Sequence, residues 1–349
     1  KDGVYYSLSG GTLPHPPSGK RTRADFLLRS EDLATWDYLH PFVEGDRFTL
    51  VGDDGACPYF WPIGNRHILL FFSHMSGGQA LLGDYDTDRD KFVVTAHHDF
   101  NFGAFSPGGV HAPSATPDGK GGVIVIFNMN PAKPTGEWNQ IMTLPRRLTL
   151  AGAGDLERDM LTVEPAGDIT SLRNDHQHVG PTPLPANQEI VLAGIRGNTL
   201  ELDAEIEVGD APMVELNVLR SPGREEFTRI AFYKQRGYRN WQRYTGWGRE
   251  WQESRDSLIT IDSSYASLLP DVQSRAPETA PVYLEPDEPL RLRVFVDRSV
   301  VEVFVNGKQC VALRVYPGRE DSLGVSLRSQ GRDATLHHLD AWQMGSIYR

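Results

Sequence analysis

The stretch LRLRVFVDRSVVEVFVNGKQCVALRVY at residues 290–316 carries the clearest structural pattern in the sequence. Apolar and polar residues alternate along it, as they do in β-strands that bury one face and expose the other. Asp297-Arg298-Ser299 and Asn306-Gly307 are turn sequences that divide the stretch into three segments. We therefore predict an antiparallel meander of three strands within a β-sandwich.

The same alternation occurs at residues 200–208. Its apolar members are Leu200, Leu202, Ala204, Ile206 and Val208, and its acidic members are Glu201, Asp203, Glu205 and Glu207. This pattern predicts a strand with one buried and one wet face. Residues 1 to about 165 differ, because runs such as HILLFF (67–72) and VIVIF (123–127) are continuously apolar between turns. Such runs favour strands buried on both faces, in a barrel, a sandwich or a propeller.

The segment DHQHVGPTPLPAN at residues 175–187 has three prolines and few apolar residues. Such a composition is typical of a linker between domains. We therefore expect one domain at residues 1–174 and a second at residues 188–349.

Composition excludes several classes of protein. The 349 residues include 35 Lys and Arg against 46 Asp and Glu, and a net charge of −11 disfavours nucleic acid as a partner. The longest apolar runs are far shorter than the about 20 residues of a membrane span, so we expect no membrane partner. Cys57 and Cys310 cannot form a zinc cluster by themselves, and no nucleotide-binding loop is present, so no cofactor or metal is expected.

Asp53 and Asp54 lie in VGDDGACPYFWPIG (51–64), between turn glycines and an aromatic run. Burial would raise the pKa of such an acid, and a second carboxylate about 5 to 10 Å away would complete a glycosidase pair. The alternative is that Asp-Asp-Gly is a solvated turn.

Histidines and aromatic residues offer weaker signals. His97-His98-Asp99 and the His176/His178 pair are possible metal ligands, although a linker histidine is the ordinary interpretation of the latter pair. The aromatic side chains of YRNWQRYTGWGREWQ (238–252) are suited either to stacking on sugars or to packing between domains.

Several segments together resemble glycoside hydrolase family 32, the group of invertases, levanases and inulinases. EWNQIMTLPRRLTL (137–150) resembles the family's Trp-x-x-x-Met-x-Leu-Pro-Arg-x-Leu signature, and residues 292–317 resemble its closing sandwich hairpin. GVHAPSAT (109–116) and RADFLLRSEDLATWDYL (23–39) match further family segments in the same order. The resemblance implies a five-bladed β-propeller followed by a C-terminal β-sandwich, and a retaining attack on a β-fructosyl bond by two carboxylates.

Two family features are missing. The nucleophilic Asp of the family lies in a Trp-Met-Asn-Asp-Pro-Asn-Gly motif that occurs nowhere in these 349 residues, and the family's Arg-Asp-Pro motif is absent too. We therefore expect that an N-terminal portion with the first blade is missing and that this segment is a partner of the chain. The acid/base Glu that precedes Cys-Pro in the family is replaced by Ala56.

A methyl group cannot donate a proton, so another acid acts, or this residue has been mutated, or the protein has lost hydrolysis and only binds sugar. We expect Asp54, with Asp53 as the other possibility, to substitute, because a two-residue offset on an extended segment would place Asp54 on the same face as Ala56. The resemblance also suggests Asp99 and His111 as contacts for sugar hydroxyl groups, against the alternative that both are structural.

These expectations define a β-fructosidase-like hydrolase that acts on a fructosyl sugar substrate, sucrose or a fructan. The alternative is a carbohydrate-binding propeller without catalysis, and a third interpretation is an enzyme for arabinose or xylose linkages. An extracellular or periplasmic location is favoured over others.

Overall fold

The computed structural model describes residues 3–13, 23–45, 50, 52–136, 138–151, 160–238, 255–285 and 287–348. In these residues the secondary structure consists of β-strands and one short 3-10 helix, η1 (Ile169–Leu172). The expected all-β class is therefore confirmed. The chain divides into two compact units. The first comprises Lys1–Asn101, Val110–Asn128 and Pro145–Thr162, and the second comprises Phe102–Gly109, Met129–Leu144 and Val163–Arg349.

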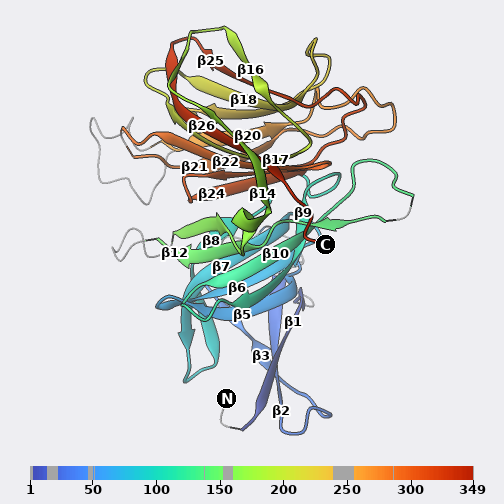
Figure 1. Cartoon of the computed structure of the whole chain (residues 1–349). Coiled ribbons are helices and arrows are strands. Elements are labelled where there is room, and N and C mark those ends of the chain that lie inside the picture. The colour runs from blue at the N-terminus through green and yellow to red at the C-terminus, as the bar shows by residue number, and fades with distance from the viewer. Residues whose placement is uncertain are drawn as a thin grey trace. The chain divides into compact units, whose positions relative to one another are not determined.

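The first unit is built from small sheets of mostly antiparallel strands (Figure 1). One sheet has the order β1-β2-β3, with β1 (Tyr5–Thr12), β2 (Arg23–Ser30) and β3 (Asp37–Pro41). Another has the order β4-β8-β7-β6-β5, with β4 (Val43–Glu44), β5 (Ala56–Ile63), β6 (Arg66–Ser73), β7 (Gly77–Asp86) and β8 (Lys91–Asp99). In a third group β10 (Val123–Met129) pairs with β9 (Val110–Pro117) and β12 (Arg146–Leu150).

Of the two continuous apolar runs, residues 67–72 are buried at nearly every position, as predicted, whereas buried and half-buried positions alternate in residues 123–127. In β6 every residue from Ile68 to Ser73 is buried, and Leu69 and Phe71 join a cluster with Leu27, Leu81 and Phe92. A central strand of a small sheet that is covered on both sides needs apolar side chains at successive positions. The sheet that contains β6 is therefore well packed, and it fixes the positions at which the loops at its ends begin.

The second unit is a β-sandwich. Its seven-stranded sheet has the order β14-β26-β17-β22-β23-β24, and β15 also pairs with β26. These strands are β14 (Arg173–Val179), β15 (Thr182–Leu184), β17 (Thr199–Glu207), β22 (Leu290–Asp297), β23 (Val300–Val305), β24 (Gln309–Arg314) and β26 (Ala334–Met344). The six-stranded sheet has the order β16-β25-β18-β19-β20-β21. Its strands are β16 (Glu189–Arg196), β18 (Met213–Arg220), β19 (Thr228–Tyr233), β20 (Ser257–Asp262), β21 (Glu278–Val282) and β25 (Gly324–Gln330). The strands β11 (Ile141–Met142) and β13 (Leu161–Pro165) belong to neither of these two sheets.

The predicted meander at residues 290–316 is confirmed as β22, β23 and β24. The turns lie where the sequence indicated, since Arg298, Asn306 and Gly307 all have positive φ angles of 52°, 50° and 64°. Successive positive φ angles at Asn-Gly match the twist of a two-residue hairpin turn. The inward side chains of the two sheets, among them Val303 and Leu216, form one apolar core.

Two expectations for this unit were wrong. The predicted linker at residues 175–187 instead contains most of β14 and all of β15, which pair with β26. The composition of this segment resembles a linker because β14 and β15 are short strands that pair with β26 alone. Such strands need few apolar residues, and an edge position tolerates Pro183. The acidic face of β17 is also not fully exposed to solvent. Glu201 is fully buried, because Arg173 and Arg293 both donate hydrogen bonds to its carboxylate.

Candidate functional site

Three of the four predicted site residues lie at one end of the β5–β8 sheet. Asp53 and Asp54 are on the loop before β5, and Asp99 is the last residue of β8. The loop needs glycine at two positions, since Gly52 and Gly55 have φ angles of +102° and +60°. A Cβ at Gly10 of β1 would lie 2.0 Å from the Gly55 carbonyl oxygen, so β1 lies directly against this loop.

Asp53 is fully buried. Its carboxylate accepts hydrogen bonds from the hydroxyl groups of Ser73 and Ser76 and from the backbone N–H of Leu50, the last at 2.6 Å. A carboxylate with three donors and no exposure holds its loop in place and has no free oxygen to offer a substrate. Asp53 therefore positions its neighbours.

Asp54 is accessible. Its two oxygens pair with His74, one with the backbone N–H at 3.1 Å and the other with Nδ1 at 2.6 Å. The side chain remains 30% exposed. Gly55, with its positive φ, interrupts the extended conformation between Asp54 and Ala56. Asp54 and Ala56 are therefore not placed on one face by the alternation of an extended strand, contrary to the expectation from the sequence.

Asp99 combines exposure with a strongly perturbed carboxyl group. It lies opposite Gln79 in the β7–β8 pairing, and His97 Nε2 lies 3.5 Å from its carboxylate. Although the side chain is 41% exposed, desolvation by the surrounding protein and the negative charge of Asp53 raise its pKa to about 6. A carboxyl group with this pKa is partly protonated near neutral pH and can donate a proton.

His111 lies on β9 and is only 8% exposed. Burial, with a smaller contribution from the charge of His74, lowers its pKa, so the imidazole is neutral at neutral pH. The ring of Phe72 contacts both histidines, at centroid distances of 4.7 Å to His74 and 5.3 Å to His111. Phe72 is also the strand partner of Ala56. The structure thus brings Ala56, the Asp54–His74 pair and His111 around one aromatic ring.

Sequence reasoning missed the polar residues that join these groups. Ser76 accepts a hydrogen bond from Gln79, and Gln79 Oε1 lies 2.7 Å from His97 Nε2, so a chain of contacts leads from Asp53 to His97. We refer to Asp53, Asp54, His74, Asp99 and His111 with these linking residues as the acidic cluster. The pairing of β7 with β8 identifies Gln79, because it places that residue opposite Asp99.

The other candidate residues lie elsewhere. His176 and His178, in the second unit, both contact Asp340 Oδ1, at 2.7 and 2.9 Å. Within the described part of the chain, no group of three or more His, Cys, Asp or Glu residues has an arrangement suited to a metal ion. The aromatic segment at residues 238–252 lies outside the described residues except for Tyr238. No helix in the described ranges is long and apolar enough to cross a membrane.

Comparison with known proteins identifies the family. A family model described as "Glycosyl hydrolases family 32 C terminal" matches residues 168–343, about half of the chain. A sucrose-6-phosphate hydrolase of Staphylococcus xylosus is 24% identical, with 96% of this chain and 62% of that protein covered. A cell wall β-fructofuranosidase of Pisum sativum is 26% identical, with 91% of this chain and 62% of that protein covered. The chain therefore spans somewhat less than two thirds of these relatives' length.

Solved structures share the fold. Fructan 1-exohydrolase IIa from Cichorium intybus matches with a TM-score of 0.80 at 18% identity, covering 99% of this chain and 70% of that chain. Sucrose-6-phosphate hydrolase from Lactobacillus gasseri matches with a TM-score of 0.72 at 19% identity, covering 99% and 65%. This likeness supports the β-propeller and β-sandwich architecture that the family resemblance implied. Taken with the family match, it shows that the chain belongs to glycoside hydrolase family 32.

Proposed function

We propose that this protein is a β-fructosidase-type glycoside hydrolase that cleaves terminal β-fructosyl bonds of sucrose or fructans. The observation that carries the proposal is the acidic cluster, in which an accessible carboxyl group with a pKa of about 6, Asp99, lies near the buried charge of Asp53. The relatives support the substrate class, because they are sucrose-6-phosphate hydrolases, a levanase and fructan exohydrolases.

In the retaining mechanism, one carboxylate attacks the anomeric carbon while an acid protonates the leaving oxygen. The same acid, now a carboxylate, then takes a proton from the water that releases the sugar. We assign the proton transfers to Asp99 rather than to Asp54, the residue expected from the sequence, because the pKa of Asp99 allows both protonation states near neutral pH. Asp54, held by His74, accepts hydrogen bonds from the fructosyl hydroxyl groups, and His111 contributes a neutral imidazole beside them.

The attacking carboxylate is assigned to a segment other than these 349 residues, because the family's Asn-Asp-Pro-Asn-Gly motif is absent from them. The protein's own N-terminal segment is the proposed source. Activity measurements therefore require the full-length protein.

Fructose release from sucrose, 1-kestose, inulin and levan tests the proposal. Asp99→Asn should lower kcat by about 100-fold or more, the usual loss when a general acid is removed. Its pH profile should also lose the transition near pH 6. Asp88→Asn, an exposed carboxylate on the turn between β7 and β8, is the matched control and should leave the rate unchanged. Absence of fructose release from all four sugars would refute the proposal.

A second candidate function is carbohydrate binding without catalysis, and Ala56 is the observation that favours it. In this case calorimetry should detect binding of 1-kestose or inulin with no product formed. Ala56→Glu offers a further distinction, since it restores a carboxylate beside the partner strand residue Phe72. Hydrolysis that appears only in Ala56→Glu would assign the natural protein to the binding class.

A further inference from the structure

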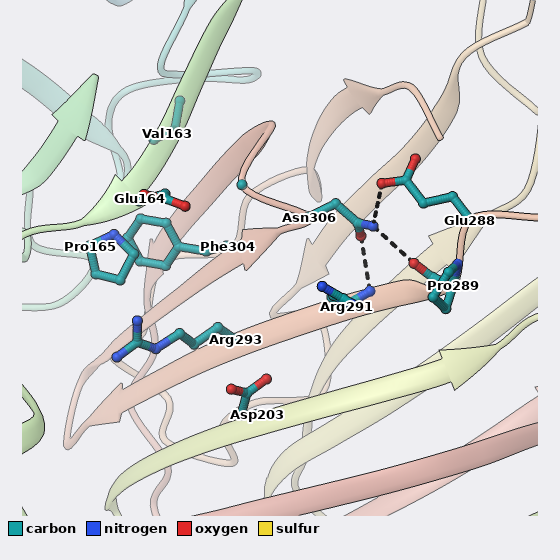
Figure 2. A pocket seen from close by; sticks show the side chains of 11 residues that line it. Val163, Glu164, Pro165, Asp203, Glu288, Pro289, Arg291, Arg293, Phe304 and Asn306 are labelled. Carbon is teal, nitrogen blue, oxygen red and sulfur yellow. Dashed lines mark hydrogen bonds between the residues drawn. The ribbon is translucent and has the colours of Figure 1, made fainter. Parts of the chain in front are cut away.

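The outer face of the seven-stranded sheet carries a pocket of about 510 Å³ (Figure 2). It lies over β17, β22 and β23, and residues 163–165 form one wall. All of its lining residues belong to the second unit. Its volume is typical of small-molecule sites, which occupy about 300–1,000 Å³.

Two charged groups in this pocket have unused hydrogen-bonding capacity. Asp203 of β17 and Arg293 of β22 are direct strand partners, yet Arg293 donates its Nε–H to Glu201, at 2.6 Å. No residue in the described part of the chain donates a hydrogen bond to the Asp203 carboxylate. Burial raises the pKa of this group, and nearby charges such as that of Arg293 oppose the rise. The terminal nitrogens of Arg293 likewise have no acceptor among the described residues. Among the described residues, the Asp203 carboxylate and the terminal nitrogens of Arg293 therefore lie on adjacent strands, where their charges interact, with no hydrogen bond between them.

The opposite rim of the pocket is fixed by hydrogen bonds (Figure 2). Asn306 donates to the Glu288 carboxylate and to the Pro289 carbonyl oxygen, each at 2.9 Å, and accepts from the Arg291 backbone N–H at 2.9 Å. Lys308 also contacts Glu288, at 2.7 Å. This rim is therefore in place before any ligand arrives, and it loses little conformational entropy on binding.

Charged groups of both signs line the pocket. The carboxylates of Glu164, Asp203 and Glu288 lie beside the guanidinium groups of Arg291 and Arg293. Arg291 pairs with Glu205, Arg293 with Glu201 and Glu288 with Lys308, so the pocket presents hydrogen-bond donors and acceptors rather than a charge of one sign. A neutral ligand rich in hydroxyl groups satisfies both kinds of polar group at once, because a hydroxyl both donates and accepts.

Apolar surface completes the site. Phe304 lies on β23, and Pro165 and Pro289 line the same pocket. Sugars present C–H faces that pack against such surfaces while their hydroxyl groups reach polar side chains.

We propose that this pocket is a sugar-binding site, in which one hydroxyl of a neutral mono- or disaccharide donates to Asp203 and a neighbouring hydroxyl accepts from Arg293. The site is formed entirely by the second unit, and it requires no catalytic residue. It therefore goes beyond the proposed function and does not depend on it.

Saturation-transfer NMR and calorimetry on the full protein, with sucrose, trehalose, glucose and glucose 6-phosphate as probes, test this proposal. Asp203→Asn should weaken binding of the neutral sugar about tenfold or more, because a hydrogen bond to a charged group is lost. Arg293→Gln is a second, independent variant, and thermal unfolding of both variants identifies any folding defect. Asp321→Asn, on an exposed turn of the same unit, is the matched control and should bind normally.

Asp99→Asn distinguishes this site from the acidic cluster. Neutral-sugar binding that survives Asp99→Asn and is lost in Asp203→Asn and Arg293→Gln supports the pocket, whatever the outcome of the fructose-release assay. Binding that is unchanged in both pocket variants overturns the proposal. So does tighter binding of glucose 6-phosphate than of glucose, or no binding of any neutral probe.

Discussion

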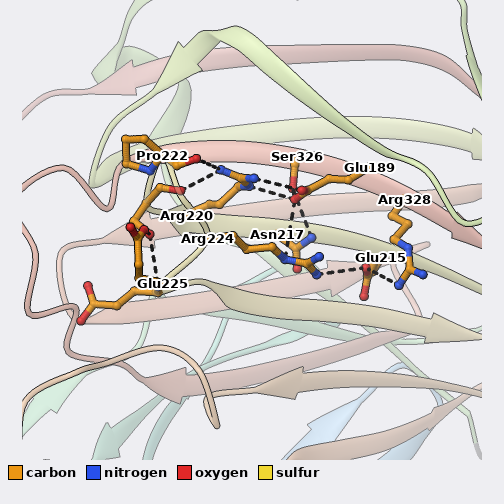
Figure 3. A network of polar contacts seen from close by, with 11 residues as sticks. Glu189, Glu215, Asn217, Arg220, Pro222, Arg224, Glu225, Ser326 and Arg328 are labelled. Carbon is orange, nitrogen blue, oxygen red and sulfur yellow. Dashed lines mark hydrogen bonds and ion pairs between the residues drawn. The ribbon is translucent and has the colours of Figure 1, made fainter.

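Glu189 offers a quantitative test of the electrostatics of the sandwich. It starts β16 and lies in a network of polar residues on the six-stranded sheet (Figure 3). Arg220 donates two hydrogen bonds to its carboxylate, at 2.8 and 2.9 Å, and Ser326 donates a third, at 2.7 Å. Arg220 is only 9% exposed, so removal of the carboxylate charge leaves a nearly buried cation with a weaker partner.

The pKa sets the size of the effect. The hydrogen bonds from Arg220, followed by the smaller one from Ser326, outweigh desolvation and lower the pKa of Glu189 from 4.5 to about 2. Such a shift corresponds to roughly 3 kcal/mol, which solvent screening at a partly exposed side chain reduces to about 2 kcal/mol. Because the pKa in the folded state is depressed, this stabilisation is fully present above pH 4.5 and is lost as the pH falls towards 2.

Urea unfolding of the natural protein and of Glu189→Gln, from pH 7 down to pH 2.5, measures this difference. We expect Glu189→Gln to lower the free energy of unfolding by about 2 kcal/mol at pH 7 and by progressively less below pH 4.5. Glu225→Gln, an exposed carboxylate on a nearby turn, should cause a clearly smaller change. Equal stability of Glu189→Gln and the natural protein at pH 7, or a difference that stays constant down to pH 2.5, would refute the reasoning.

Three further substitutions test packing and loop support. Gly10→Ala places a methyl group against the Gly55 carbonyl oxygen and should lower the free energy of unfolding by about 1–3 kcal/mol, measured by thermal unfolding. Sugar binding at the acidic cluster, measured by calorimetry, should also be lost because the loop with Asp54 must move. Glu226→Gln should lower the free energy of unfolding in urea by about 3 kcal/mol, because the buried carboxylate accepts hydrogen bonds from three backbone N–H groups and the Ser322 hydroxyl. An unchanged free energy of unfolding would show that these donors find other acceptors. Phe232→Ala should cost about 3–5 kcal/mol, because the ring is 1% exposed within the sandwich core, and a loss below 1 kcal/mol would contradict that packing.

The acidic cluster shows where prediction from sequence ends. The acids beside an aromatic run directed attention to Asp53 and Asp54, and the resemblance to the family added Asp99 and His111. The three aspartates lie at one sheet end. Their separate roles could not be predicted, because Asp53 and Asp54 are adjacent in sequence but differ in burial. Hydrogen bonds from Ser73 and Ser76, some 20 residues away, make Asp53 a buried support, whereas Asp54 faces His74 and solvent.

Where the hydrophobic pattern is clear, the sequence by itself determined the strands and the faces that they bury. Period-two alternation at residues 290–316 and continuous apolar runs such as residues 67–72 act through local geometry, because successive side chains of a strand point to opposite faces. Only the tertiary structure decided that residues 173–179 and 182–184 are strands, that Glu201 is buried, and that Asp203 and Arg293 line a pocket. These outcomes depend on partners brought from distant parts of the chain, β26 for β14 and two arginines for Glu201, and no local pattern contains that information.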